Sequence, residues 1–152
     1  GGVPAFVAAM NAKARALGMT TAFFGDPTGL DTRNVASPRD LAKMVSAAYE
    51  YGVIRQFSTQ QSYDFDLGNR ILSAHNTNAL VRSDNWEIGV SKTGYISEAG
   101  RCLVMQARVA DKPVVIVLLD SNGKMTRVGD ANRIKRWMES AGLGSAQTRR
   151  SA

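Results

Sequence analysis

The pattern of apolar and polar positions divides the chain into a helical first part, a strand-rich middle and a final helix. Apolar residues recur every three to four positions over residues 4–17 and 37–51, which predicts two amphipathic helices. Ser37 can cap the second helix, Pro38 suits its first turn, and Asp40 stands where a capping-box acid would reach back. The apolar stripes of the two helices are Phe6, Met10, Ala14 and Leu17, then Leu41, Met44, Val45, Ala48 and Tyr49.

The segment between the two helices is too long for a simple connector. Residues 19–36 are rich in Gly, Asp, Asn, Thr and Pro, so we expect an ordered loop near a functional surface. Gly52 is expected to end the second helix, and strand character is expected from Gln56 onward.

The middle of the chain shows the period-2 alternation of strands. Residues 58–67 place Tyr63, Phe65 and Leu67 on one side, 68–70 form a turn, and the chain returns from Ile71. Residues 86–96 alternate as a half-buried strand, and 102–110 with 113–119 predict a hairpin that turns at Asp111-Lys112. The run 114–119 is apolar on both faces, which predicts a central strand.

A last helix is predicted over residues 125–141, and residues 144–152 are expected to be a disordered tail. The predicted stripe of this helix is Val128, Ala131, Ile134, Trp137, Met138 and Ala141. The chain is therefore expected to be α+β: two helices, an antiparallel sheet of about five strands, and a C-terminal helix packed on it.

Composition limits the function classes. With 152 residues, 44% hydrophobic and 21% charged, the chain is expected to form one globular domain, and no apolar run is long enough for a membrane span. The net charge of +6 is scattered and not interleaved with aromatic residues, which favours a solvated basic face over a nucleic-acid surface.

One cysteine and one histidine exclude an internal disulfide and an ordinary metal site, so no cofactor is expected, and Cys102 is expected to be a buried thiol. The methionines on the apolar stripes, with Met105, are expected to lie in the core.

The end of the strand over residues 86–96 carries the main candidate chemistry. Lys92 offers a charge for a carboxylate, Thr93 a hydroxyl that can donate and accept, and Gly94 a backbone that a ligand can approach closely. The alternative is a strand that simply ends in a turn. Lys-Thr-Gly is also one of three motifs of serine enzymes that recognise penicillin, so the surrounding sequence decides between the two.

The surrounding sequence resembles the low-molecular-mass penicillin-binding proteins, which are D-alanyl-D-alanine peptidases of the periplasm. The resemblance runs in order through residues 6–11, 17–19, 27–30, 37–41, 76–78, 92–95, 99–104 and the last helix with Trp137. It implies a β-lactamase/DD-peptidase-like fold, with the sheet and part of a helical lobe. The end of the resemblance soon after the last helix is similar to the endopeptidase branch of the family.

The nucleophile motif of the family, Ser-x-x-Lys, has no counterpart in the right place. Residues 83–85 (Ser-Asp-Asn) and 121–124 (Ser-Asn-Gly-Lys) match family motifs literally but in the wrong order, and we interpret both as chance matches. The resemblance therefore implies that residues 1–143 are the C-terminal portion of a single DD-peptidase domain. Its partner would be the N-terminal part of the same protein, which bears the nucleophile. The start at Gly1 is read as a cut piece or a mature product.

The resemblance also implies roles for individual residues. Lys92 and Thr93 would bind the terminal carboxylate of a peptidoglycan peptide or a β-lactam, and the Tyr95 N–H would help form the oxyanion hole. Asn76 and Asn78 are candidates for lining the cleft, or for satisfying backbone groups in a bend. His75 is the alternative candidate for a Ser-His-Asp site, but no suitable serine or acid can be nominated. An alternative function is a peptidoglycan- or β-lactam-binding module that lacks a nucleophile.

Overall fold

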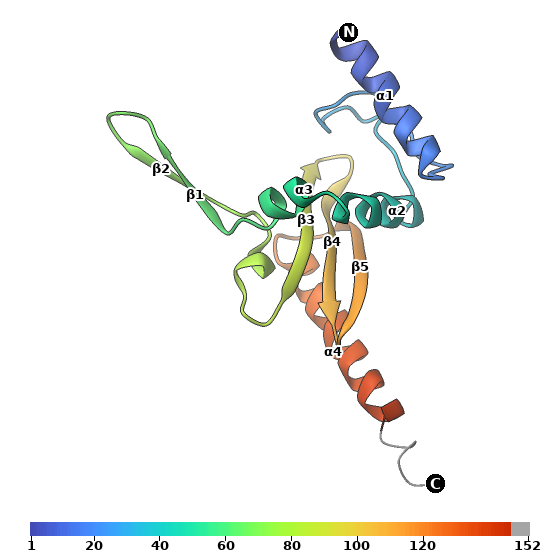
Figure 1. Ribbon diagram of the computed structural model, residues 1–152, viewed down its shortest axis with the longest axis vertical. Coiled ribbons are helices and arrows are strands. Elements are labelled where there is room, and N and C mark those ends of the chain that lie inside the picture. Colours follow the sequence, from blue (N-terminus) through green and yellow to red (C-terminus); the bar gives the residue numbers. More distant parts are fainter. Residues whose placement is uncertain (147–152) are drawn as a thin grey trace.

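The computed structural model describes residues 1–146, and Figure 1 shows their arrangement. In chain order, the elements are α1 (Gly2–Ala16), α2 (Pro38–Tyr49), α3 (Gly52–Ser58), β1 (Ser62–Asp66), β2 (Ile71–His75), the short 3-10 helix η1 (Ala79–Arg82), β3 (Glu87–Ile96), β4 (Gly100–Val109), β5 (Lys112–Ser121) and α4 (Thr126–Ala146). The five strands are antiparallel, as predicted, but they form two separate units: a three-stranded sheet in the order β3-β4-β5 and a hairpin of β1 and β2.

The centre of the three-stranded sheet is β4, not the apolar run of residues 114–119. In the register, Met105 of β4 stands between Ser91 of β3 and Ile116 of β5, so β5 is an edge strand of this sheet. The prediction of a central strand was therefore wrong in position. The expected cover on both faces is nevertheless present, because α4 packs on one face of β5 and α2 on the other. This explains why residues 114–119 are apolar on both faces.

The main core lies between the sheet and α4. Leu103, Met105 and Ala107 of β4 are fully buried there together with Ala131 of α4. Val128, Ile134 and Met138 of the predicted α4 stripe pack against this cluster, whereas Trp137 is 69% exposed. Met138, seven residues after Ala131, takes the position that faces the sheet, and Trp137 is turned about 100° away from it.

The α2 helix begins as its sequence predicts, but Asp40 has a different partner. The Ser37 hydroxyl accepts the Asp40 N–H at 3.2 Å, which is the expected N-cap. The Asp40 carboxylate accepts the N–H of Thr21 at 2.8 Å and its hydroxyl at 2.7 Å. Asp40 therefore ties the start of the loop over residues 19–36 to α2.

A helix replaces the predicted strand start after α2. Gly52 opens α3, which continues to Ser58, so the strand begins only at Ser62. This helix is one of the shortest elements, and the N-cap residue Tyr51 makes no side-chain hydrogen bond, so the sequence carries no start signal for it.

In Figure 1, α1 and the β1–β2 hairpin extend away from the sheet. In α1, only Ala14 of the predicted stripe is buried, and Phe6 is 59% exposed. The Asn11 amide joins α1 to the loop, because it donates to Phe24 O at 2.7 Å and accepts from Phe24 N–H at 2.9 Å.

The hairpin has the predicted side-chain alternation but no cover. Every residue of β1 and β2 is exposed, and the rings of Tyr63 and Phe65 lie on the same side with centroids 4.8 Å apart. At the other end of the chain, α4 continues to Ala146, so residues 144–146 of the predicted tail are helical. Residues 147–152 of that predicted tail lie outside the described residues.

Candidate active site

Lys-Thr-Gly lies in an edge strand whose outer side is open. β3 pairs with β4 on one side, and on the other side the Ser91 N–H donates to the Ser58 hydroxyl of α3 at 3.3 Å. In an antiparallel pair, the N–H groups of successive residues point alternately toward and away from the neighbouring strand. The N–H of Thr93 and that of Tyr95 therefore point away from β4, as the N–H of Ser91 does.

A cavity of about 540 Å³ opens beside these residues. Its wall on the β3 side contains Lys92, Thr93, Gly94 and Ile96. The remaining lining residues come from the loop, α2, the turn after β3, β4 and β5: Phe24, Thr32, Asn34, Val35, Ala36, Leu41, Glu98, Ala99, Cys102, Val104, Leu119 and Asp120. The Lys92 side chain is exposed, and its ammonium donates to the carbonyl of Thr93. A ligand in this cavity would thus meet a largely apolar wall that carries the Lys92 cation and the carboxylates of Glu98 and Asp120.

Thr93 and Gly94 differ in how much room surrounds them. The Thr93 hydroxyl hydrogen-bonds to the Thr77 hydroxyl, with the two oxygens 2.6 Å apart. A Cβ added to Gly94 would meet only the Cβ of Cys102, at 4.0 Å. Space for a ligand therefore remains over the backbone of Gly94.

The amides of Asn76 and Asn78 are used within the protein. Asn76 donates to the carbonyls of Ser58 at 3.1 Å and Gln60 at 3.0 Å. Asn78 is 2% exposed, donates to the Ser91 hydroxyl at 2.9 Å and caps η1. This geometry favours the second interpretation, in which the two asparagines satisfy polar groups in a bend.

Sequence reasoning did not single out Arg127, which stands beside the candidate site. This residue lies in the first turn of α4, and its guanidinium donates to the carbonyl of Cys102 at 3.0 Å and to that of Gly94 at 3.4 Å. A cation in the first turn of a helix opposes the helix dipole. Because a basic residue is unfavourable at this position of a helix, the sequence could have indicated that Arg127 has a role outside the helix.

Cys102 is less buried than predicted, and His75 lies at the surface. Cys102 is half-buried rather than buried, because its partner across the strands is Gly94, which has no side chain to cover the thiol. His75 ends β2 and is exposed, and no hydrogen bond of residues 1–146 joins its imidazole to a serine or an acid. The geometry thus favours a surface histidine.

The two literal motif matches do not form a nucleophile site. Ser83 follows η1, and its hydroxyl accepts the Asn85 N–H at 3.4 Å in a local turn. Ser121 is the last residue of β5, and Lys124 lies in the turn before α4. A serine and a lysine on successive helical turns would be needed to bring the amine beside the hydroxyl, and neither match provides this.

The loop that forms one wall of the cavity is held by charged hydrogen bonds. Asp26 accepts from the Thr28 hydroxyl, the Asn34 amide and two backbone N–H groups, and these bonds lower its pKa to about 2. The Thr21 hydroxyl and N–H, with Lys43, lower the pKa of Asp40 to about 2 as well. A backbone bridge between Phe23 and Val35 closes the loop, which is therefore ordered, as predicted.

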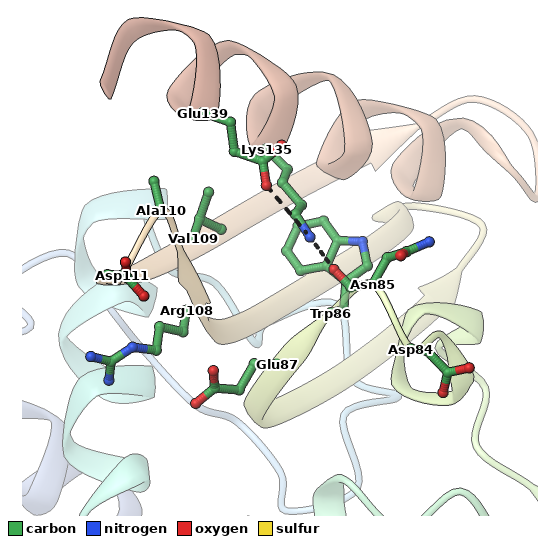
Figure 2. A pocket seen from close by; sticks show the side chains of 10 residues that line it. All are labelled: Asp84, Asn85, Trp86, Glu87, Arg108, Val109, Ala110, Asp111, Lys135 and Glu139. Atoms are coloured by element: carbon green, nitrogen blue, oxygen red, sulfur yellow. Dashed lines mark hydrogen bonds and ion pairs between the residues drawn. The ribbon is translucent and has the colours of Figure 1, made fainter. Parts of the chain in front are cut away.

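A second pocket, of about 320 Å³, lies at the other end of the sheet, and Figure 2 shows its side chains. There Lys135 of α4 lies over the Trp86 ring, with the ammonium 5.0 Å from the ring centroid, and pairs with Glu139 at 3.7 Å. Trp86 donates to the Asn132 side chain at 2.9 Å. These groups satisfy one another and fasten α4 to the start of β3.

Residues 1–146 contain no group of three or more Cys, His, Asp or Glu side chains placed to hold a metal ion. No helix among them is long and apolar enough to cross a bilayer.

An antiparallel sheet with helices on both faces, whose edge strand carries Lys-Thr-Gly beside a cavity, is typical of the serine enzymes that recognise penicillin. The chain belongs to the D-alanyl-D-alanine carboxypeptidase family, whose sequence pattern matches residues 1–123. The resemblance seen in the sequence is thus confirmed.

The relatives of this chain are bacterial peptidases. It is 45% identical over 141 residues to the D-alanyl-D-alanine endopeptidase of Escherichia coli K12, which covers 91% of this chain and 46% of the relative. It is 44% identical over 141 residues to the endopeptidase of Pseudomonas aeruginosa, with the same coverage. The chain therefore spans about half the length of the curated relatives it matches.

Solved structures confirm the fold class. A mutant of the Streptomyces K15 DD-transpeptidase superimposes with a TM-score of 0.78 at 29% identity, over 93% of this chain and 55% of that one. The D-alanyl-D-alanine carboxypeptidase of Mycobacterium tuberculosis gives a TM-score of 0.72 at 25% identity, over 88% and 55% of the two chains. The predicted α+β, DD-peptidase-like fold with its C-terminal helix is correct.

Proposed function

We propose that the intact protein is a periplasmic peptidoglycan D-alanyl-D-alanine peptidase that forms a serine acyl-enzyme and is acylated by penicillins. This chain supplies the Lys-Thr-Gly side of its active site. The observation that carries the proposal is the position of Lys92, Thr93 and Gly94 at the open edge of β3, beside a cavity with room for a peptide.

The carboxylate of the substrate is bound by charge and hydrogen bonds. Lys92 supplies a cation that is exposed at the cavity, and the Thr93 hydroxyl supplies a donor. Arg127 adds a second cation close to Gly94, since its guanidinium already reaches the carbonyl of that residue. A terminal D-alanine and the acid group of a penicillin both carry this carboxylate, which accounts for their shared recognition.

The acyl group lies over the backbone of Gly94 and Tyr95. The serine oxygen attacks the carbonyl carbon of the D-Ala peptide bond, and the negative charge moves to the carbonyl oxygen. The Tyr95 N–H, which points to the open edge of β3, donates to that oxygen, and each such donor stabilises the transition state by about 2.7–4 kcal/mol. The amine then leaves with a proton, and water hydrolyses the ester to release the serine.

The nucleophile and its lysine come from the N-terminal part of the same protein. The curated relatives are about twice as long as the matched region, and no helix of the described residues contains a Ser-x-x-Lys sequence. Exposed apolar side chains on α1 and in the loop after it provide a surface for that part: Val3, Phe6, Phe23 and Val35 are each at least half exposed.

We further propose endopeptidase rather than carboxypeptidase activity. The relatives at 45% and 44% identity are named endopeptidases, whereas the related carboxypeptidases are 28% to 32% identical. The test is digestion of purified cross-linked peptidoglycan by the full-length protein, followed by chromatography of the fragments. An endopeptidase converts cross-linked dimers to monomers of unchanged peptide length.

The other outcomes of this digestion separate the alternatives. Loss of one D-alanine from uncross-linked peptides would show a carboxypeptidase. Binding of the fragments without any cleavage would contradict the enzyme and favour a binding module. A Lys92→Ala variant is the control, since it removes the carboxylate cation and should lower cleavage at least tenfold.

A further inference from the structure

We propose that Thr77 is a positioning residue for the carboxylate-binding hydroxyl of Thr93. The two hydroxyl oxygens are 2.6 Å apart, a short hydrogen bond between two neutral groups. The inference rests on the proposed function, because it assigns Thr77 a role toward the same substrate carboxylate. It adds a residue outside the Lys-Thr-Gly motif to that site.

Thr77 is held in place from both sides. Its neighbour Asn76 donates to the carbonyls of Ser58 and Gln60, and the carbonyl of Asn76 accepts from the Arg82 guanidinium at 2.7 Å. The following residue, Asn78, is buried and joined to the Ser91 hydroxyl. The backbone at Thr77 is therefore fixed relative to β3, and its hydroxyl is directed at Thr93 without being buried itself.

The hydrogen bond matters because a hydroxyl has only one proton to donate. If Thr93 donates to Thr77, an oxygen lone pair of Thr93 faces the incoming carboxylate, and the two repel. If Thr77 donates to Thr93, the Thr93 proton is free to point at the carboxylate. The arriving anion selects the second arrangement, in which Thr77, Thr93 and the carboxylate form one line of donors and acceptors that polarise one another.

This arrangement predicts that Thr77 affects only ligands with a charged carboxylate. In the full-length protein, Thr77→Val keeps the side-chain shape but removes the donor, and Thr77→Ser keeps the donor. The measurement is the second-order rate of acylation by benzylpenicillin and by its methyl ester, in which the carboxylate charge is masked. We expect Thr77→Val to lower the rate with benzylpenicillin about tenfold and to leave the rate with the ester within twofold. Thr77→Ser should behave as the wild type with both.

A double variant separates positioning from structure. If Thr77 acts through Thr93, Thr77→Val should have no further effect in a Thr93→Val background. Equal loss with the acid and the ester, additive effects in the double variant, or no effect of Thr77→Val would each overturn the inference. Thr77→Ala replaces Thr77→Val if the valine variant does not fold. A wild-type protein that benzylpenicillin does not acylate would instead refute the proposed function.

Discussion

Lys92 and Thr93 take up different positions because neighbouring side chains of a strand point to opposite faces. Lys92 shares its face with Gly94, while Thr93 shares its face with Ser91 and meets the segment that carries Thr77; all three residues of the motif line the cavity. The order Lys-Thr-Gly was legible in the sequence, and so was its place near the end of a strand. The partner of Thr93 was not, because Thr77 and Thr93 come together only through the bend between η1 and β3.

The carboxylate of Asp40 is expected to make the stability of the fold depend on pH. Its pKa is lowered from an ordinary value of 3.8 to about 2 by hydrogen bonds from Thr21 and by Lys43. A lowered pKa in the folded state stabilises the fold above the unfolded pKa, and this contribution is lost as the pH falls toward the folded pKa. Asp40→Asn removes the charge but keeps the shape.

We therefore expect the full-length protein to be more stable than its Asp40→Asn variant near pH 6, with the difference shrinking between about pH 4 and pH 2. Urea unfolding at several pH values measures this. Asp26, whose pKa is also about 2, titrates in the same window in both proteins, so it cancels in the comparison. A difference that stays constant down to pH 2 would contradict the assignment of the shift to Asp40.

Among the elements, those with a clear helical or strand periodicity were found close to their predicted positions. The α2 helix has Ser37 as its cap, and α4 buries the stripe around Ala131, as expected. Two expectations about elements were wrong because they depend on contacts between distant residues. The short α3 has no side-chain cap, and the position of β5 in the sheet cannot be read from an apolar run that is covered on both faces.

At Gly89, the β3 strand lies in close contact with the α2 helix. β3 is irregular between Ile88 and Val90, and a Cβ on Gly89 would lie 2.3 Å from the Gln106 side-chain oxygen and 2.4 Å from the Tyr49 ring of α2. Gly89→Ala should therefore force the Gln106 and Tyr49 side chains out of their packed positions and lower the free energy of unfolding by about 1–3 kcal/mol.

The matched control for Gly89→Ala is Gly129→Ala in α4. There the added Cβ would meet only the flexible Arg133 side chain, at 3.5 Å, and a glycine in a helix interior costs about 0.8–1 kcal/mol relative to alanine. Urea unfolding of both variants should show opposite signs. A Gly89→Ala variant as stable as the wild type would show that α2 does not press on the sheet at this point.

Seen as a whole, the molecule has one well-covered face and several uncovered elements. The face of the sheet under α4 is packed, whereas α1, α3 and the β1–β2 hairpin expose large apolar side chains. An isolated two-stranded hairpin is marginally stable in water, so its exposed apolar side also calls for a partner. The family resemblance alone suggested that an N-terminal part of the protein packs against this chain. The exposed apolar surfaces provide places where that part could bind.

Residues 1–152 alone are therefore expected to associate, either with the N-terminal part of the protein added as a separate chain or with copies of themselves. Light scattering after size-exclusion chromatography measures the mass in each case. A dye that binds apolar surface measures how much of that surface remains exposed. Addition of the N-terminal part should lower dye binding and produce a one-to-one complex. A monomer of residues 1–152 that binds little dye would contradict this prediction.

Lys92 is proposed to bind the carboxylate of a ligand that acylates a serine from another part of the protein. The most direct test is labelling by a fluorescent penicillin of the full-length protein, its Lys92→Ala variant and a Lys112→Ala control at the opposite end of the sheet. Wild type and Lys112→Ala should label at the same rate, Lys92→Ala at least tenfold more slowly, and residues 1–152 alone not at all. Equal labelling of the Lys92→Ala variant and the wild type would contradict the claim.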